Sequence, residues 1–259
     1  MNNIEIIPLG TVSPYCKGEC NCVGILIKYK DNKFLLDCGN GITRLMSFPG
    51  DLNKLNVFIS HFHDDHFGDI GCIQYSSYVY HNLGFINDKV NVYLPKNDFR
   101  LCKDKIVSNI ESYCNYFDID DDICYYIDDL KISFKDNKSH TINSYMIKLE
   151  SDGVKIVYTS DIGNTNINDI IDFSYGSDLL ICESSFIIEH NSNSKTHLTA
   201  SMAGKIAVLS NCKKLLLTHF WPEADKQLYL NEALKEFDNV EVSKEGKKFL
   251  VRCRNDNYK

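Results

Sequence analysis

The sequence lacks the features that mark membrane, secreted and multidomain proteins. Its 259 residues contain no run of about 18 apolar residues, the length that a membrane-spanning helix requires. The first residues, MNNIEIIPLG, lack the basic flank and long apolar segment of a signal peptide. No linker rich in Pro, Gly or Ser, low-complexity tract or short repeat divides the chain. We therefore expect one cytoplasmic domain spanning residues 1–259 that does not bind a membrane.

Basic residues are fewer than acidic residues in this chain. The chain has 28 Lys and Arg against 35 Asp and Glu, which gives a net charge of −7. Sequence-independent nucleic-acid binding relies on Lys and Arg that neutralise phosphates. A dedicated duplex-binding protein is therefore not favoured. Two uneven stretches, the aspartate-rich FDIDDDICYYIDDL and the basic tail after Ser243, are interpreted as solvated faces.

The cysteines do not suggest a disulfide framework. Their number, 11, is odd, their spacing is irregular, and most lie in strand-like or helix-like stretches. Reduced thiols in a cytosolic protein fit this pattern better. Cys16, Cys20 and Cys22 form the one cluster, but a closed zinc site needs four ligands and no fourth is evident nearby. A metal at this cluster is therefore not favoured.

Apolar residues make up 44% of the chain, and their patterns alternate between strand and helix. The patterns predict strands at 4–10, 22–29, 33–38, 56–60, 90–95, 130–134, 144–150, 154–161, 178–185 and 214–220. Asn32 marks a hairpin, and the turn SDG marks another between 144–150 and 154–161. Helices are predicted at 68–84, 97–112, 166–173, 196–210 and 225–237, with Thr196 as the expected cap of the fourth. This alternation predicts a layered α/β architecture.

The segment ISHFHDDHFGDI, residues 59–70, concentrates titratable side chains in the loop between a buried strand and a helix. Neutral imidazole and carboxylate are ligands for zinc and similar divalent metals. In an extended loop His61 and His63 lie on one side, whereas Asp65 and His66 turn into the helix. The set is therefore able to serve two adjacent ions, and Asp64 is the variable position between ligands.

Four ligands are too few for two ions, so others must come from further strand ends. Three residues have this placement: His140 before TINSYMIKLE, Asp161 at the end of VKIVYTSD, and His219 at the end of KLLLTH. His81 and His190, in a helix and a polar loop, lack it and are expected to be surface residues.

The order LLDCG, HFHDDH, His140, YTSDIG, LLLTHF resembles the metallo-β-lactamase fold superfamily from about residue 4 to 250. The resemblance implies a four-layer αββα sandwich of two similar halves, with the site at one edge between the sheets. It also implies that Asp37 orients ligands. The implied ligands are His61, His63 and His140 for one metal and Asp65, His66 and His219 for the other, with Asp161 bridging.

Two further segments narrow the resemblance to one branch. CESSF, with Glu183, resembles the HEATF-type segment of the ribonuclease Z group, and HLTASMAGKIA, with His197, resembles its H-[ST]-[TS]-A helix start. LLLTHFWPEADKQLYLNEALKEF resembles the tail of small bacterial phosphodiesterase-like members, including enzymes that open cyclic nucleotides. Ribonuclease Z itself carries a long tRNA-gripping arm between the lone His and the bridging Asp. Only 20 residues separate His140 from Asp161, so this enzyme is less favoured.

The resemblance implies a phosphodiesterase with two divalent ions, Zn²⁺ first and Mn²⁺ or Fe²⁺ as alternatives. A hydroxide that bridges the ions would attack phosphorus, and Asp65, Asp161 and Asp37 are predicted to take part in the catalysis. His197, held by Glu183, would protonate the leaving alkoxide. The expected substrate is a small phosphodiester such as a cyclic nucleotide. A ribonuclease Z-like RNA-processing nuclease and a non-catalytic metal-binding protein of the same fold remain alternatives, and a homodimer is left open.

Overall fold

The computed structural model describes residues 3–96, 114–151, 153–190 and 194–253. The contacts divide the chain into two compact units. The first unit consists of residues 2–119 and 244–250, and the second mainly of residues 120–243 and 251–259. Each unit is built around one seven-stranded sheet. That the whole chain forms one domain stays a prediction.

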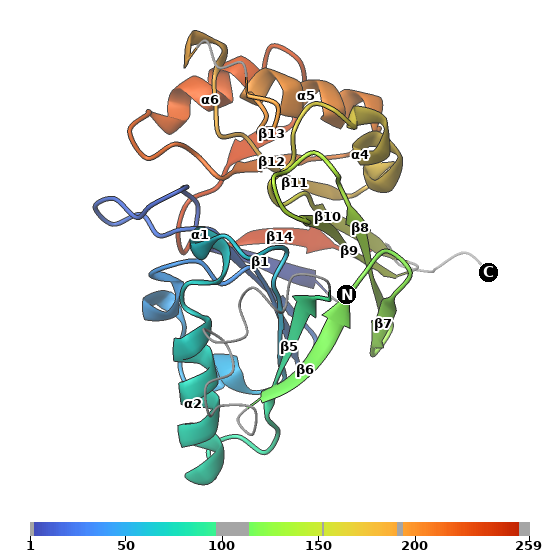
Figure 1. Ribbon diagram of the computed structural model, residues 1–259. Coiled ribbons are helices and arrows are strands. Elements are labelled where there is room, and N and C mark those ends of the chain that lie inside the picture. The colour runs from blue at the N-terminus through green and yellow to red at the C-terminus, as the bar shows by residue number, and fades with distance from the viewer. Residues whose placement is uncertain (1–2, 97–113, 152, 191–193, 254–259) are drawn as a thin grey trace, which may run out of the picture. The chain divides into compact units, whose positions relative to one another are not determined.

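The sheet of the first unit is mixed, with an antiparallel part and a parallel part. β1, β2 and β3 pair antiparallel, and β3, β4, β5 and β6 pair parallel. Helix α2 packs on β5 and β6, as Figure 1 shows. The strands in spatial order are β14 (Phe249–Arg252), β1 (Asn3–Gly10), β2 (Gly24–Tyr29), β3 (Asn32–Leu36), β4 (Leu55–Phe58), β5 (Val90–Pro95) and β6 (Cys114–Ile119). The helices are η1 (Ile42–Leu45), η2 (Gly50–Leu52), α1 (Asp64–Phe67) and α2 (Ile70–Asn82).

The second unit repeats this plan. β7, β8, β9 and β10 pair antiparallel, and β10, β11, β12 and β13 pair parallel. The strands in spatial order are β13 (Val240–Val242), β12 (Leu215–Thr218), β11 (Leu179–Glu183), β10 (Val154–Tyr158), β9 (Tyr145–Ser151), β8 (Leu130–Asp136) and β7 (Cys124–Ile127). The helices are α4 (Ile167–Ser174), η3 (Ile188–His190), α5 (Ala200–Leu209) and α6 (Lys226–Ala233).

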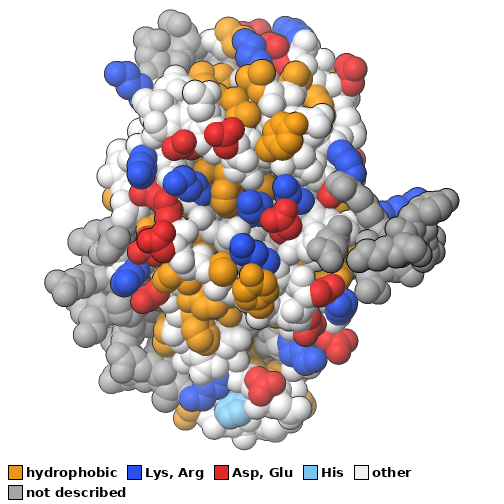
Figure 2. Space-filling model, turned by 90° about the vertical axis from the view of Figure 1, so that its right-hand side faces the viewer, with side chains coloured by type: hydrophobic (Ala, Val, Ile, Leu, Met, Phe, Trp, Pro, Cys, Tyr) orange, Lys and Arg blue, Asp and Glu red, His pale blue; other side chains and the backbone are white. Residues whose placement is uncertain are grey.

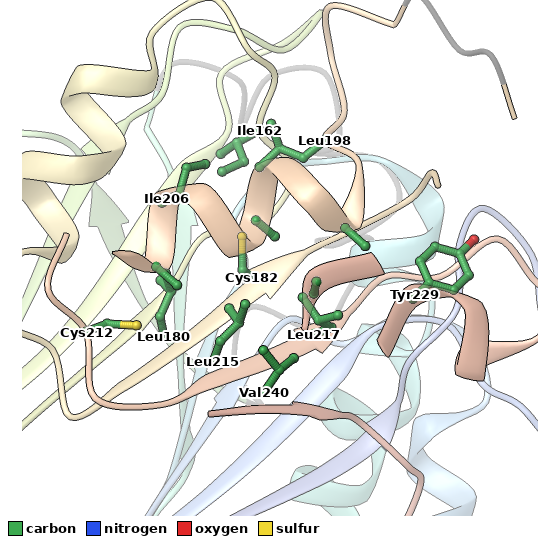
Figure 3. Packing of buried hydrophobic residues seen from close by; sticks show 14 of the residues in the cluster. Ile162, Leu180, Cys182, Leu198, Ile206, Cys212, Leu215, Leu217, Tyr229 and Val240 are labelled. Carbon is green, nitrogen blue, oxygen red and sulfur yellow. The ribbon is translucent and has the colours of Figure 1, made fainter. Parts of the chain in front are cut away.

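The core of the second unit lies between its parallel strands and α5 and α6 (Figure 3). β11 and β12 are buried along their whole length, which accounts for the unbroken apolar runs LLIC and LLL in the sequence. Leu180 and Leu217 from these strands join Ile206 from α5 and Tyr229 from α6, all fully or almost fully buried. This packing fixes the ends of β11 and β12, from which Glu183 and His219 emerge.

Most predicted elements are confirmed within a few residues, and the predicted helix at 97–112 lies outside the described residues. The predicted cap is wrong: Thr199, not Thr196, precedes the first helical residue of α5, and its hydroxyl accepts a hydrogen bond from the Met202 N–H at 3.3 Å. A cap must lie directly before the helix, and residues 196–198 instead form the approach that carries His197.

Two surface properties bear on partners. In the part of the chain that the structure describes, no helix is long and apolar enough to cross a membrane. Figure 2 shows basic and acidic side chains intermixed on the face in view.

Candidate metal centre

The first set of predicted ligands lies in the loop between β4 and α2 of the first unit. His61 and His66 are fully buried and Asp65 nearly so, and all three follow β4 within eight residues. The His61 Nε2 atom lies 3.2 Å from His63 Nδ1, and the His66 Nε2 atom lies 3.6 Å from Asp65 Oδ2. The sequence therefore brings these four side chains together as predicted, with their ligand atoms close to one another.

Asp37, directly after β3, is a buried carboxylate that organises this loop. Its oxygens accept hydrogen bonds from the Ser60 N–H at 2.7 Å, the Ser60 hydroxyl at 2.9 Å and His66 Nδ1 at 2.7 Å. A carboxylate can only accept, so His66 carries a proton on Nδ1 and a lone pair on Nε2. Asp37 thus leaves the Nε2 atom of His66 available as a metal ligand.

Ser60 extends the same control to a second histidine. A hydroxyl has one proton, and Ser60 gives it to Asp37. The Ser60 oxygen lies 3.0 Å from His61 Nδ1 and is left to accept a hydrogen bond there. His61 therefore also carries its proton on Nδ1 and a lone pair on Nε2. Sequence reasoning assigned Asp37 an orienting part but did not find Ser60, because a serine beside a histidine carries no pattern of its own.

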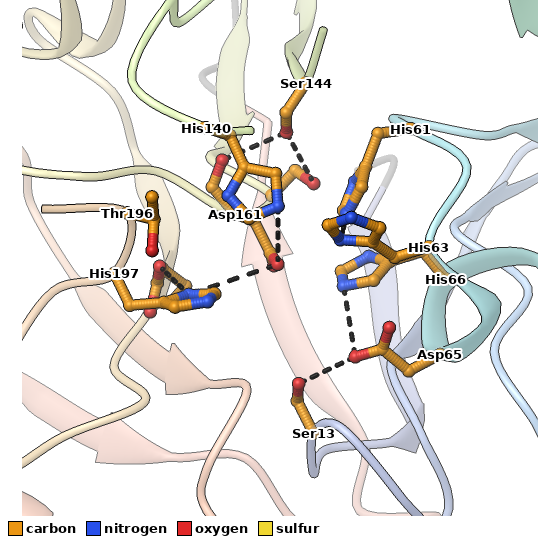
Figure 4. A network of polar contacts seen from close by, with 12 residues as sticks. Ser13, His61, His63, Asp65, His66, His140, Ser144, Asp161, Thr196 and His197 are labelled. Atoms are coloured by element: carbon orange, nitrogen blue, oxygen red, sulfur yellow. Dashed lines mark hydrogen bonds and ion pairs between the residues drawn. The ribbon is translucent and has the colours of Figure 1, made fainter. Parts of the chain in front are cut away.

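Ser13 is a further contact that the sequence did not indicate. Its hydroxyl donates to Asp65 Oδ2 at 2.7 Å, and both residues are almost fully buried. Figure 4 shows this bond and the Asp65–His66 contact beside it. The bond from Ser13 holds one oxygen of the Asp65 carboxylate and so orients the whole group.

The second set of predicted ligands lies in the second unit, with His140 in the segment between β8 and β9 and the other two just beyond strands. Asp161 follows β10 and His219 follows β12, and both are buried. Asp161 Oδ1 lies 2.8 Å from His219 Nε2, and Asp161 Oδ2 lies 3.8 Å from His140 Nε2 (Figure 4). The predicted bridging carboxylate therefore lies between the two predicted histidines of its own unit.

Glu183, the last residue of β11, is the buried carboxylate of this second set. It accepts hydrogen bonds from the Ile162 N–H, the Ser185 N–H, the Ser185 hydroxyl and His197 Nδ1, at 3.2, 3.0, 2.8 and 2.9 Å. The predicted Glu183–His197 pair is thus present. His197 has a side chain that is 23% exposed, and its Nδ1 lies 4.0 Å from Asp161 Oδ2. Asp161, His197 and His219 each place one ligand atom within 4.8 Å of the others.

Strained backbone accompanies both sets. Asp37, Ser160 and His219 adopt positive φ values of 59°, 54° and 64°, although none is a glycine. Such conformations cost about 1–3 kcal/mol each and concentrate at functional sites. At Asp37 and His219 this conformation changes the chain direction directly after β3 and β12, where the two side chains join the candidate site.

Two glycines let neighbouring loops approach the strand ends. A Cβ atom on Gly39, two residues after Asp37, would lie 2.1 Å from the Asp65 carbonyl oxygen. A Cβ atom on Gly163, two residues after Asp161, would lie 1.7 Å from the Lys195 carbonyl oxygen. Only glycine permits approaches this close. The glycines of LLDCG and YTSDIG therefore position the loops that carry Asp65 and His197.

The sequence analysis also made predictions about histidines and cysteines outside these two sets. His81 is exposed on α2, as predicted. His190 is half-buried in η3 and accepts from the Ile187 N–H, so its interpretation as a plain surface residue is wrong.

In the cysteine cluster, Cys16 Sγ and Cys22 Sγ lie 3.5 Å apart. Burial and the Cys16 contact raise the pKa of the Cys22 thiol well above its usual range. That no metal is favoured at this cluster stays a prediction.

The donor atoms of both sets fit divalent metal ions. Imidazole nitrogens and carboxylate oxygens are the ligands that zinc and similar ions take in proteins. The hydrogen bonds of Asp37 and Ser60 fall on Nδ1 atoms, which is the usual way that a protein presents the Nε2 atom of a histidine to a metal. The candidate metal clusters that the structure contains thus agree with use of a divalent metal.

Solved structures similar to this chain define its class. The metallo-β-lactamase fold protein YhfI from Bacillus subtilis matches 97% of this chain with 100% of its own, at a TM-score of 0.84 and 24% identity. A diphosphatase of the PhnP family matches 97% of this chain and 99% of its own, at a TM-score of 0.75 and 14% identity. The chain has the metallo-β-lactamase fold, which confirms the predicted αββα class.

Comparison of sequences gives the family. The chain is 29% identical to a ribonuclease Z from Picrophilus torridus over 301 aligned positions, covering 96% of each protein. It is 27% identical to the probable metallo-hydrolase YhfI of Bacillus subtilis over 221 positions, covering 85% of this chain and 88% of that protein. The family model described as Anti-Pycsar protein Apyc1 matches residues 4–226. The chain belongs to the Anti-Pycsar protein Apyc1 family, within the metallo-hydrolases of the metallo-β-lactamase fold.

Proposed function

We propose that this chain is a phosphodiesterase with a dinuclear metal site that cleaves a small phosphodiester, such as a cyclic nucleotide. The observation that carries the proposal is the shared orientation of histidines: hydrogen bonds to Nδ1 leave lone pairs on the Nε2 atoms of His61 and His66. Buried imidazoles held this way beside carboxylates suit a metal site, and the family of metallo-hydrolases to which the chain belongs supports a hydrolytic one. The proposed ligands are His61, His63, Asp65, His66, His140, Asp161 and His219.

We propose Zn²⁺ as the resident ion, with Mn²⁺ or Fe²⁺ as alternatives, because imidazole and carboxylate ligands accept all three. Two such ions, when bound, would polarise the phosphoryl group and lower the pKa of water from 15.7 to about 7. The contribution of the chain is to orient the ligands. Asp37 does this for His66, and Asp161 lies between His140 and His219 as a bridging ligand would.

His197 is the proposed general acid. The Glu183 carboxylate accepts from His197 Nδ1 at 2.9 Å, which orients the ring and stabilises its protonated form. The side chain is partly exposed, whereas Glu183 is fully buried, so His197 is the member of the pair that a substrate can reach. A positioned acid that donates a proton to the leaving alkoxide contributes about 10²–10⁴-fold to the rate.

Three observations support a small substrate. The interval between His140 and Asp161 is occupied by the hairpin of β9 and β10, which leaves no room there for a long arm. The alignment with ribonuclease Z, 301 positions, exceeds the 259 residues of this chain, so that relative has segments that this chain lacks. The net charge of −7 also opposes binding of a large polyanion.

A ribonuclease Z-like nuclease is the second candidate, because the Picrophilus torridus relative, matched over almost its whole length, carries that name. Under this alternative the basic tail or a partner would replace the arm. A gel shift with precursor tRNA at two salt concentrations separates the candidates, since phosphate-driven binding weakens steeply with salt. Absence of a shift at low salt removes the nuclease candidate.

The proposal is tested by a hydrolysis screen with defined metals. Cyclic nucleotides, linear dinucleotides, precursor tRNA and a chromogenic bis-aryl phosphate are the substrates, and Asp161→Ala is the control. We expect metal-dependent cleavage of a small diester that falls to background in Asp161→Ala and about 10²–10⁴-fold in His197→Ala. Stoichiometric metal with no hydrolysis of any substrate would instead identify a non-catalytic metal-binding protein. A homodimer and a cytoplasmic location stay predictions.

A further inference from the structure

We infer that Cys16 and Cys22 form a site of reversible oxidation, at which a peroxide converts the two thiols into a disulfide. Both cysteines belong to the first unit, and neither has a part in the candidate metal centre. They are free thiols whose sulfur atoms lie 3.5 Å apart. A disulfide requires about 2.05 Å between its sulfurs, so a short approach closes the bond. The formation of this bond does not depend on the proposed function.

One backbone carbonyl holds both cysteines side by side. The Asn40 oxygen accepts a hydrogen bond from the Cys22 N–H at 3.0 Å and another from the Cys16 thiol at 3.1 Å. Val12 and Cys22 also pair as a β-bridge, which fixes the base of the loop that joins them. The contact between the two sulfurs is therefore set by the backbone of this loop and not by two freely rotating side chains.

The two thiols have different surroundings, which assigns them different steps. Cys16 is exposed, as are its neighbours from Pro14 to Glu19, so a small peroxide reaches its sulfur. Cys22 is 1% exposed. Burial, followed by the contact with Cys16, raises the pKa of the Cys22 thiol well above its usual range. Since the thiolate is the nucleophile, Cys16 is the thiol that the peroxide oxidises first.

The oxidation takes place in two balanced steps. The Cys16 thiolate attacks one peroxide oxygen, an S–O bond forms, the O–O bond breaks, and the other oxygen leaves and takes up a proton. The Cys22 sulfur then attacks the Cys16 sulfur, an S–S bond forms, the S–O bond breaks, and the hydroxyl leaves as water with the Cys22 proton. The two sulfurs together lose two electrons, which the peroxide gains. A dithiol reverses the change by thiol–disulfide exchange.

The first step also prepares the second. The contact with Cys16 is one of the causes that raise the pKa of the Cys22 thiol. A neutral sulfenic acid at Cys16 carries no charge that opposes a thiolate beside it, so this cause is weakened. The two sulfurs are already neighbours, so the second step is intramolecular and needs no diffusing partner.

The pair lies in a loop that also holds Asp65. Ser13, three residues before Cys16, donates to Asp65 Oδ2 at 2.7 Å (Figure 4). Formation of the disulfide removes the thiol proton that Cys16 donates to the Asn40 carbonyl and draws Cys16 toward Cys22. We expect this shift to weaken the bond from Ser13 and, with it, metal binding by Asp65. This consequence, unlike the disulfide itself, rests on the proposed function.

Peptide mapping after peroxide treatment tests the modification. The full chain is treated with hydrogen peroxide, its free thiols are alkylated during unfolding, and the disulfides are located by mass spectrometry. We expect a Cys16–Cys22 bond in the unmodified chain and in the matched control Cys20→Ser, which removes the third cysteine of the same loop. The bond should be absent in Cys16→Ser. In Cys22→Ser a dione reagent should trap the sulfenic acid at Cys16.

Three results of the mapping overturn the inference. Cys16 stays reduced, or it pairs with Cys20, or it passes to the sulfinic acid without a bond to Cys22. The unmodified chain alone decides among these results. The test therefore stays decisive even where Cys22→Ser fails to fold.

Chelator competition measures the consequence at the metal site. We expect oxidation to lower the zinc affinity of the unmodified chain about tenfold, the lower end of the loss caused by removing an outer contact of a ligand. The same peroxide treatment should leave Cys16→Ser unchanged. Equal affinities of the reduced and oxidised chains overturn the consequence, and so does weaker binding by reduced Cys16→Ser, which would make Cys16 itself a zinc ligand. A chain that forms the disulfide but binds no zinc even when reduced contradicts the proposed function, and the consequence with it, and supports the modification.

Discussion

The two units of this chain orient their histidines with the same chemistry but from different positions in their sheets. In the first unit Asp37 follows β3 and Ser60 follows the neighbouring strand β4. In the second unit Glu183 is the last residue of β11 and Ser185 follows that strand. The arrangement is therefore not a copied local segment. In both units a buried carboxylate accepts hydrogen bonds from a serine and a histidine, but the carboxylate and the serine come from neighbouring strands in the first unit and from one strand in the second.

The two units also differ in the proposed roles of their histidines, which are metal ligands in the first unit and a metal ligand and a general acid in the second. Both histidines oriented by Asp37, His61 and His66, are proposed metal ligands. Of the two near Glu183, His219, which contacts the Ser185 hydroxyl, is a proposed ligand and His197 the proposed acid. His197 is the more exposed of these two, with a side chain 23% exposed against 2% for His219. Loss of Asp37 should therefore affect metal binding alone, whereas loss of Glu183 should affect metal binding and proton transfer together.

The largest effect is expected in Glu183→Gln. The neutral amide no longer stabilises a protonated His197, so we expect the rate at saturating zinc to fall about 10²–10⁴-fold. Zinc affinity should also fall, because Ser185 loses its charged acceptor. Turnover of a bis-aryl phosphate across a zinc titration measures both quantities. An unchanged rate at saturating zinc would remove Glu183 and His197 from the chemistry.

Asp37→Asn is expected to have a narrower effect. The change replaces an acceptor of three hydrogen bonds by an amide that also presents hydrogens to donors. We expect an about 10–100-fold loss of zinc affinity, measured by chelator competition. The rate at saturating zinc should stay close to that of the unmodified chain. A rate loss as large as that of Glu183→Gln would contradict the division of labour between the two units.

The two glycines test whether both units need the same close approach. Gly39→Ala and Gly163→Ala each place a methyl group against a backbone carbonyl, at 2.1 and 1.7 Å. We expect each to lower the free energy of unfolding by about 1–3 kcal/mol, measured with denaturant. Gly71→Ala in α2 is the control, since nothing lies within 4 Å of its added methyl group. A loss in one unit only would show that the loop of the other unit is free to move away.

The smallest effect is expected in Tyr229→Phe. The change removes the hydrogen bond to the Ser185 carbonyl and keeps the packing of the ring. We expect a loss of about 1 kcal/mol in the free energy of unfolding. Burial raises the pKa of Tyr229 to about 12, so the hydroxyl remains a donor throughout the neutral range. A large loss of zinc affinity would mean that α6 controls Ser185 more strongly than the carboxylate does.

The residues that follow a periodic or motif pattern were predictable from the sequence. The apolar runs of β11 and β12 predict buried strands, and HFHDDH at the end of β4 predicts a ligand loop. Asp161 and His219 were found because strand ends deliver side chains to a common edge. Strands β6, β7, β13 and β14 were missed. The last two have only three or four residues, which give too little alternation to detect.

The serines show where sequence reasoning stops. Ser13, Ser60 and Ser185 each donate to a carboxylate of the candidate site. Serine is common in loops, and its part here depends on which oxygen or nitrogen lies within about 3 Å, which no spacing rule provides. The same holds for the cap of α5, where Thr196 and Thr199 are equally good residues and only the start of the helix decides.

The central proposal, that the chain hydrolyses a phosphodiester with two metal ions, is tested most directly by a zinc titration. Metal-free chain receives increasing equivalents of Zn²⁺, and the rate of bis-aryl phosphate hydrolysis is followed at each addition. The account predicts a rate that rises from background and saturates at two equivalents per chain. A rate that does not depend on zinc, or that saturates at one equivalent, would contradict it.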